Sequence, residues 1–289
     1  MAGSLDDDLH SRGSRAMLTR TMHRPPVPVG LAFRFRLPMG APQVGHGLKP
    51  DAESLDGGSP VISVIIPTLN EPEAARRAVL SAGPFAGTEV IVVQGAVAGA
   101  RPIEGLPAGV VVTASPPGRA RQMNDGARLA RGEILLFLHA DTQLPAGYDA
   151  MVRQALDQPS AIAGAFSLRI DGRGMMLRLI ERAVAFRSRV AGFPYGDQAL
   201  FLRKAVFDEL GGFPTLPIME DFEFVRTLRR RGRIHTLAEP VLTSAARWDR
   251  LGAIRTTLLN QAFIAAHLCG VSSDSIARWY HRGRSSAAP

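Results

Sequence analysis

An apolar run that stops abruptly on a carboxylate most constrains how this chain can fold. Residues 132–142 read GEILLFLHADT, with a glycine at the start and polar residues at the end. Such a run predicts a strand buried on both faces, as in parallel sheets that helices cover. Because strand side chains alternate, we expect His139 and Asp141 on the same side where the strand ends. Ligands of such sheets bind beyond the carboxyl ends of the strands.

Asp141 has two interpretations, and the run alone leaves both open. A carboxylate at this edge suits a hard cation, because Mg²⁺ or Mn²⁺ needs only one or two protein carboxylates when a substrate diphosphate supplies other oxygens. In the other interpretation, Asp141 caps the helix expected after Pro145.

Further apolar runs indicate the fold class. They begin near Val61, Thr88 and Gly109, and segments with helical periodicity separate them. Strands that alternate with helices predict parallel pairing and right-handed crossovers. The expected fold is therefore α/β, with a doubly wound, mostly parallel sheet flanked by helices. Later helices are expected at residues 175–190, 220–232 and about 251–268.

Composition divides the chain into three parts. Residues 1–58 are rich in Gly, Pro, Ser and Arg and lack periodicity, so we expect a flexible extension. Residues 59–248 are expected to form the sheet domain, and residues 249–289 a helical segment that packs on it. The single Cys269 allows no internal disulfide, and the amino terminus lacks the apolar core of a signal peptide. The expected location is therefore cytoplasmic.

The formal net charge of +8 at pH 7 indicates anionic partners or serves solubility. Aromatic residues make up only 6% of the chain and no nucleic-acid-binding module is recognisable, so nucleic acid is not an expected partner. Phosphates and an anionic membrane surface remain as the expected anionic partners. Residues 175–190 predict a basic amphipathic helix, which packs on the sheet, closes over a substrate or lies on a membrane. The longest apolar stretch, residues 262–271, is too short to span a bilayer.

Polar residues follow the apolar runs and give the first candidate site residues. Thr68, Asn70 and Glu71 come after the first strand and can hydrogen-bond a base or ribose. Arg119 and Arg121 mark the start of a helix, where free N–H groups and the helix dipole favour a phosphate. In the other interpretation, both arginines only coat a solvent-exposed face.

Acidic residues in two later segments complete the candidate set. Glu220 and Asp221 start a helix, where acids often only complement the dipole. Beside a bound diphosphate and metal, such a carboxylate can instead take the proton from an attacking hydroxyl. Asp197 and Gln198 either bind sugar or acceptor hydroxyls or form a polar turn.

In this order, the segments resemble glycosyltransferase family 2, which has the GT-A fold, over nearly all of residues 61–280. IIPTLNE at 65–71 is similar to the family's opening nucleotide-binding strand and loop. NDG at 124–126, followed by the run that ends at Asp141, looks like the segment with its metal-binding Asp-X-Asp motif. Glu220-Asp221 resembles the pair that contains its catalytic base. SPPGRARQMN, PYGDQ and MED, which start at 115, 194 and 219, look closest to a bacterial subgroup of arsenosugar-biosynthesis-associated glycosyltransferases.

This resemblance implies an inverting, metal-dependent glycosyltransferase of the hexosyltransferase class. It moves a sugar from a nucleotide diphosphate sugar, with uridine as the expected nucleoside, to an acceptor hydroxyl. Asp221 is the implied catalytic base, and Asp141, with His139 as a further candidate, is the implied ligand of Mn²⁺ or Mg²⁺. The implied substrate- and nucleotide-binding residues are Pro67, Thr68, Asn70, Glu71, Gln94, Arg119, Arg121, Asn124, Ala140, Asp197, Gln198, Glu220, Arg247 and Trp248.

The chain departs from the family pattern at three positions. Gln94 stands where the family usually has an Asp for the nucleobase, and His139 replaces the first acid of the Asp-X-Asp motif. Ser244 replaces the Gln that elsewhere precedes an Arg-Trp pair like Arg247-Trp248. Two alternatives therefore stay open: a non-catalytic nucleotide-binding relative, and a polyprenyl-phosphate sugar synthase with peripheral contact at the inner face of the membrane.

Overall fold

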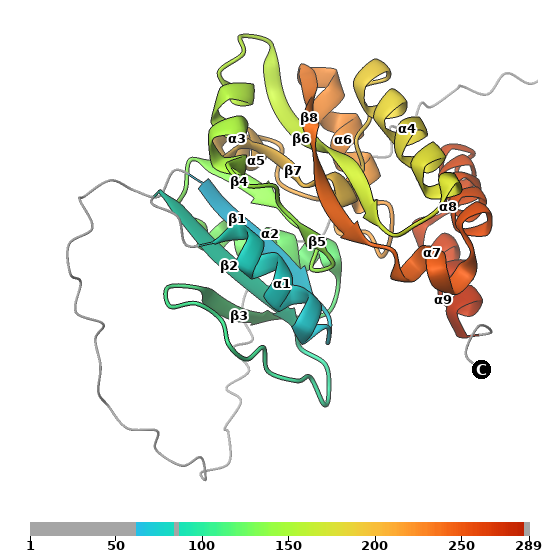
Figure 1. The fold of residues 1–289 in the computed structure, drawn as a ribbon, viewed down its shortest axis with the longest axis horizontal. Coiled ribbons are helices and arrows are strands. Elements are labelled where there is room, and N and C mark those ends of the chain that lie inside the picture. The colour runs from blue at the N-terminus through green and yellow to red at the C-terminus, as the bar shows by residue number, and fades with distance from the viewer. Residues whose placement is uncertain (1–61, 84–86, 286–289) are drawn as a thin grey trace, which may run out of the picture. The chain divides into compact units, whose positions relative to one another are not determined.

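An eight-stranded sheet forms the centre of the computed structural model, which describes residues 62–83 and 87–285 (Figure 1). The expected extension, residues 1–58, lies outside the described residues. The strands are β1 (Ile62–Thr68), β2 (Thr88–Gly95), β3 (Val111–Ser115), β4 (Ile134–Phe137), β5 (Thr142–Gln143), β6 (Ala161–Asp171), β7 (Leu200–Arg203) and β8 (Arg233–Ser244).

The strand order is β3-β2-β1-β4-β7-β6-β8-β5. The pairs β1–β2, β2–β3, β1–β4 and β6–β8 are parallel, and β4–β7, β6–β7 and β5–β8 are antiparallel. The prediction of a mostly parallel, mixed α/β sheet is confirmed. The helices are α1 (Pro72–Ala82), α2 (Arg119–Leu129), α3 (Tyr148–Leu156), α4 (Met175–Val190), α5 (Lys204–Glu209), α6 (Glu220–Arg231), α7 (Ala246–Leu251), α8 (Ala253–Leu268) and α9 (Ser273–Ser285), with a 3-10 turn at Gly196–Gln198.

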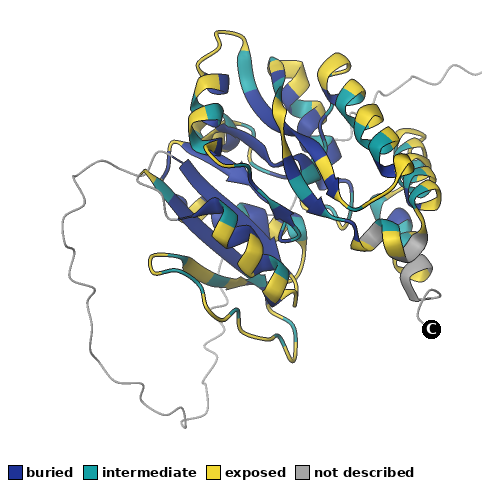
Figure 2. Cartoon of the chain, in the orientation of Figure 1, coloured by how far each residue is buried: buried dark blue, intermediate teal, exposed yellow. Residues whose placement is uncertain are grey.

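Helices cover both faces of the sheet, as the alternation of buried strand residues requires. Ile62, Val64 and Ile66 of β1 join one core, which packs against α1, α3 and α4. Ile65 joins the other core, which packs against α2, α5 and α6. All of β1 is buried, and the inner strands are dark blue in Figure 2.

Gly126 lets α2 lie directly against the sheet. A Cβ at this position would lie 2.5 Å from Cγ2 of Ile65 and 3.0 Å from Cγ2 of Val93. Because the interior is close-packed, a larger residue would push the helix outward. The close contact holds α2 against β1 and β2, and Gln122, one turn earlier in α2, bonds to the carbonyls of Thr68 and Val93 near the carboxyl ends of these strands.

Two predicted elements differ from those observed. β4 ends at Phe137, and the Thr142 N–H donates to the His139 carbonyl at 3.0 Å, so residues 139–142 form a turn. Strand alternation therefore does not place His139 and Asp141, contrary to expectation. The expected helix at 251–268 begins instead at Ala253, because Gly252 has a φ of 79° that separates α7 from α8. Such a positive φ is incompatible with a continuous α-helix. None of the described helices is long and apolar enough to cross a membrane.

A buried carboxylate links the amino-terminal ends of β1, β2 and β4, at the end of these strands away from the candidate site residues. Glu89 of β2 accepts hydrogen bonds from Oγ of Ser63 (2.6 Å) and from the N–H groups of Arg131 and Gly132 just before β4. Burial acts to raise the pKa of Glu89, but the hydrogen bonds from Ser63 and Arg131 and the Arg131 charge together lower it below its ordinary value. Glu89 is therefore a charged structural residue.

We expect Glu89→Gln to lower the free energy of unfolding at pH 7 by about 1–3 kcal/mol, because backbone donors then lose a charged acceptor. The native pKa is lowered, so this contribution is complete above the ordinary value of 4.5 and is lost as the pH falls through the native pKa. Urea unfolding at neutral and acid pH should show the wild type and the variant converging on acidification. Glu104→Gln, at an exposed acid, is the control. A difference independent of pH would contradict this assignment.

Candidate active site

The carboxyl ends of β1 and β2 form the first part of the site. Thr68 and Gln94 are register partners in the parallel ladder. Gln122 of α2 is buried beneath them, and its Nε2 donates to the carbonyls of Thr68 and Val93, both at 2.8 Å. This single amide joins both strand ends to the first turn of α2. Oγ1 of Thr68 is buried without a hydrogen-bond partner among the described residues.

Gln94 and Asn70 hold the loop that follows β2. Nε2 of Gln94 donates to the Arg101 carbonyl (2.7 Å), and the Arg101 N–H donates to Oδ1 of Asn70 (3.3 Å). Asn70 has a φ of 56°. Asparagine tolerates this left-handed conformation better than most residues. The bond from Gln94 uses its amide nitrogen, so it leaves open the expected role of the oxygen as a nucleobase acceptor.

The amino-terminal ends of α2 and α6 meet through an ion pair. Nε of Arg119 donates to Oε1 of Glu220, the first residue of α6, whose side chain is 2% exposed. Burial acts to lower the pKa of Arg119, but the carboxylates of Glu220 and Asp221 raise it above its ordinary value. Arg121, two residues along α2, is exposed. Two cations and two helix amino termini therefore surround this part of the site.

Asp221 is the second residue of α6 and is fixed by two backbone donors. Its Oδ2 accepts from the Gly196 N–H (3.0 Å), and its Oδ1 accepts from the Phe222 N–H (2.8 Å). Burial acts to raise the pKa of Asp221, but Arg119, the Gly196 N–H and His139 lower it below its ordinary value. Asp221 is therefore an oriented, ionised carboxylate at neutral pH.

Gly196 is the point where His139 and Asp221 converge. A Cβ at Gly196 would lie 2.8 Å from Oδ2 of Asp221 and 3.0 Å from Nε2 of His139. The 3-10 turn thus contacts side chains from the loop after β4 and from the start of α6. These two residues are distant from Gly196 along the sequence, and only a residue without a side chain leaves both in place.

Asp141 lies two residues beyond His139 and is partly exposed. Its Oδ1 accepts from Oγ1 of Thr142 (3.2 Å), and its carbonyl accepts from the Ser244 N–H (3.0 Å). Thr142 also pairs with Thr243 where β5 joins β8. The end of β8 therefore lies beside Asp141. Within the described residues, no three His, Cys, Asp or Glu side chains group closely enough to hold a metal ion together.

The remaining residues that were expected to bind substrate differ in how far they are buried. Trp248 in α7 is partly buried against the larger core, and the side chain of the neighbouring Arg247 is outside the described part of the chain. Pro67 and Ala140 are buried, and Ala140 belongs to the larger core. Glu71 is exposed immediately before α1.

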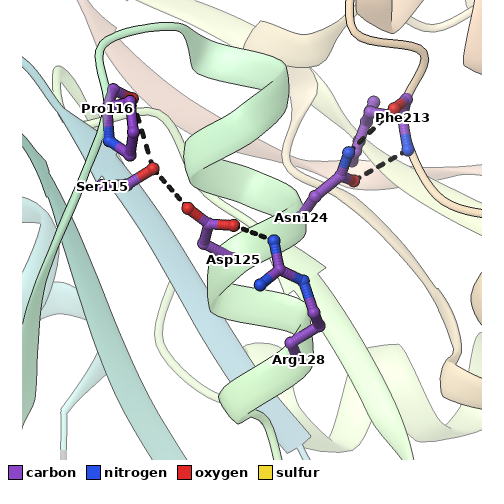
Figure 3. A network of polar contacts seen from close by, with 6 residues as sticks. All are labelled: Ser115, Pro116, Asn124, Asp125, Arg128 and Phe213. Carbon is purple, nitrogen blue, oxygen red and sulfur yellow. Dashed lines mark hydrogen bonds and ion pairs between the residues drawn. The ribbon is translucent and has the colours of Figure 1, made fainter. Parts of the chain in front are cut away.

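Asn124 makes two backbone hydrogen bonds across the site (Figure 3). Its Nδ2 donates to the Phe213 carbonyl (2.8 Å), and its Oδ1 accepts from the Phe213 N–H (2.9 Å). The neighbouring Asp125 bonds to Ser115 and Arg128. Asn124 was expected to bind substrate, but in this structure both ends of its amide anchor the loop that leads to α6.

Gln198 is likewise a buried structural residue in this conformation. Its Oε1 accepts from Oγ of Ser188 (3.0 Å), and from Arg187 and the Tyr195 N–H at 3.1 Å, and its Nε2 donates to the Phe166 carbonyl. The Arg187 guanidinium also lies 3.4 Å from the centroid of the Tyr195 ring. These contacts fix the 3-10 turn, which includes the partly buried Asp197.

Sequence reasoning missed Gln122, Gly196 and Arg187 as residues that build the site. A glutamine that bonds two strand ends has no local sequence signature. The glycine inside a polar PYGDQ segment did offer a signal, because glycine often marks a close approach of the backbone to other groups.

Comparison with known proteins identifies the family. The profile described as glycosyl transferase family 2 matches residues 63–211. The structure of residues 1–349 of S. aureus TarS in complex with UDP is 19% identical, with a TM-score of 0.51, and the match covers 64% of this chain and 60% of that one. The mannosyltransferase PcManGT from Pyrobaculum calidifontis, in complex with GDP-Man and Mn²⁺, is 21% identical, with a TM-score of 0.49, over 65% of this chain and 57% of that one.

The chain therefore spans at most 60% of either of these structures. No curated protein sequence matches it. The likeness to TarS confirms the GT-A arrangement of sheet and helices, and the profile match covers more than half of the chain. The chain belongs to glycosyltransferase family 2.

Proposed function

We propose that this glycosyltransferase moves a sugar from a nucleotide diphosphate sugar to an acceptor hydroxyl, with inversion and with Asp221 as the general base. The arrangement of Asp221 carries this proposal. Two backbone N–H groups hold its carboxylate, and neighbouring positive charge keeps it ionised. Each carboxylate oxygen can accept more than one hydrogen bond, so both can still receive a hydroxyl proton.

In the proposed reaction, Asp221 takes the proton of the acceptor hydroxyl while the hydroxyl oxygen forms a bond to the anomeric carbon. The bond from that carbon to the diphosphate breaks, and its electron pair leaves with the diphosphate. Attack on the face opposite the diphosphate inverts the anomeric centre. Arg119 and Arg121 at the start of α2 offset the negative charge that develops on the leaving group.

For the donor, we propose that the nucleoside lies over the ends of β1 and β2. The buried Oγ1 of Thr68 and the amide oxygen of Gln94 are candidate groups for the base or ribose. The UDP bound to TarS supports uridine as the nucleoside. The arsenosugar-associated subgroup stays a prediction, and the acceptor is proposed only as a hydroxyl compound.

The donor set fits a divalent metal that arrives with the diphosphate. Mg²⁺ or Mn²⁺ bound in this way needs one or two protein carboxylates, and Asp141, at the partly exposed edge of the site, would supply one. His139 is the further candidate ligand. When bound, the ion would neutralise charge on the diphosphate.

Donor and metal binding can be tested by thermal unfolding. A ligand that binds only the folded protein at about 100 times its Kd stabilises it by about 2.7 kcal/mol, so UDP-sugars should raise Tm and Mn²⁺ should raise it further. We expect Asp141→Ala to lose the Mn²⁺-dependent increment. Asp157→Ala, at an exposed acid on another loop, should keep it. An unchanged increment in Asp141→Ala would remove Asp141 as a metal ligand, and no response to any nucleotide sugar would overturn the proposed donor class.

A further inference from the structure

The outer face of α4 carries an apolar stripe that nothing in the described structure covers. Met175, Leu179, Ala183, Phe186 and Val190 are spaced by three or four residues, so they share one side of the helix. All five are exposed, and Met175, Phe186 and Val190 keep 80%, 69% and 69% of their accessible surface. The opposite side packs on the sheet core through Leu177, Ile180 and Val184.

The outer face of α8 repeats this pattern. Ile254, Leu258, Ala262, Ala265 and Leu268 share one side of the helix. All five are exposed, Leu258 by 64%. Helices α4 and α8 contact each other, and both show exposed residues in Figure 2. Two neighbouring helices thus each present a second apolar side besides the one that is packed. We call Met175, Leu179, Phe186, Val190, Ile254 and Leu258 the α4–α8 surface.

The exposed charges on these two helices are all positive. Helix α8 contains no acid, and Arg255 is its exposed charge. The single acid of α4, Glu181, is only partly exposed and is engaged by Arg178 and the Ile170 N–H. Arg182 and Arg189 are exposed on α4, and the segment immediately before α4 carries one exposed charge of each sign, Asp171 and Arg173. The stripes are therefore bordered by cations without exposed carboxylates on the same helices.

We infer that the α4–α8 surface docks on an anionic membrane, with both helices lying in the plane of the interface. An amphipathic helix such as α4 buries its apolar side about 5–10 Å into the headgroup and acyl boundary, and arginines attract anionic lipids. Helix α8 is apolar around most of its circumference and adds its exposed side to this contact. With 16 residues each, α4 and α8 present about 24 Å of helix to that boundary.

A second copy of the chain fits this surface less well than a membrane. A two-fold interface places the same patch against itself, so Arg182 and Arg255 would find no exposed carboxylate on α4 or α8 to pair with. An anionic bilayer supplies the missing negative charge and also accepts the apolar stripes. Docking of this kind requires no sugar transfer, so its test is independent of the donor assays.

Sedimentation of the full-length protein with vesicles tests the inference. We expect binding to vesicles of phosphatidylcholine mixed with phosphatidylglycerol, and much weaker binding to phosphatidylcholine alone. Phe186→Glu on α4 and Leu258→Glu on α8 should each weaken binding about tenfold or more, because an anchoring side chain is lost. Arg182→Ala should weaken it by about fivefold. The matched control is Leu80→Glu on α1, at another exposed leucine, and it should bind like the wild type.

Every variant keeps residues 1–61, so differences between them report on the α4–α8 surface. Substitutions at exposed side chains are expected to preserve folding, and circular dichroism checks this. Absence of binding to anionic vesicles would overturn the inference, as would equal weakening by Leu80→Glu. A concentration-dependent dimer that Phe186→Glu dissociates, in a protein that ignores vesicles, would instead assign the surface to a second copy.

Discussion

Asp221→Asn is expected to lower kcat for sugar transfer by about 10²–10⁴, the usual contribution of a positioned general base, while donor binding persists. The substitution keeps the size of the side chain and removes the charge that accepts the proton. Because Arg119 and Arg121 are unchanged, the groups proposed to bind the diphosphate stay in place. Transfer is measured by release of the nucleotide diphosphate in the presence of an acceptor, and donor affinity by calorimetry.

The asparagine amide also removes a hydrogen-bond acceptor, and the resulting loss of stability needs a control. Both carboxylate oxygens of Asp221 accept backbone N–H groups, and an amide nitrogen cannot accept either of them. We therefore expect a loss of about 1–3 kcal/mol of stability, so Tm must be measured alongside kcat. Asp208→Asn on α5 makes the same chemical change at an exposed acid and should leave transfer unaffected. Normal turnover by a folded Asp221→Asn enzyme would rule out Asp221 as the base.

The sequence predicted those elements whose pattern is local. The continuous apolar runs of β1 and β2 and the helical spacing of α4 need no tertiary information. β8 was not predicted. Pro240 lies within it, and a proline ordinarily argues against a strand. The structure accommodates this proline where the register between β6 and β8 shifts, from Ala165 opposite Thr236 to Ser167 opposite Pro240. Such an irregularity is set by pairing and has no local signal.

The site also contains residues with a local sequence pattern and residues whose contacts depend on the fold. Glu220 and Asp221 were recognisable as acids in a first helical turn, and the structure brings them to Arg119 as a charged group. By contrast, the bonds of Gln122 to Thr68 and Val93 and of Asn124 to Phe213 depend on packing between elements. From the sequence alone, each of these amides could hydrogen-bond either a ligand or the backbone.

Gly196→Ala should reduce kcat by about 10²-fold with little change in the backbone, because it displaces the two side chains that meet at this glycine. The new Cβ would lie 2.8 Å from Oδ2 of Asp221, closer than real Cβ contacts, and a tight 3.0 Å from Nε2 of His139, so at least the Asp221 carboxylate must shift. Misplacing a catalytic group by about 1 Å costs about 10²-fold in rate. Gly196 has no positive φ, so alanine brings no backbone strain of its own.

Gly232→Ala is the matched control for this substitution. Gly232 has an extended φ of 174°, and its added Cβ would approach the side chain of Ile162, at 3.2 Å, beyond the carboxyl end of α6. Both variants add one methyl group without left-handed strain, so only the contacts with His139 and Asp221 distinguish them. If Gly196→Ala kept the wild-type kcat at an unchanged Tm, the observed position of Asp221 would not be the one that transfers the proton. A loss of kcat confined to Gly196→Ala, with donor affinity retained, would support the role of this glycine in orienting the base.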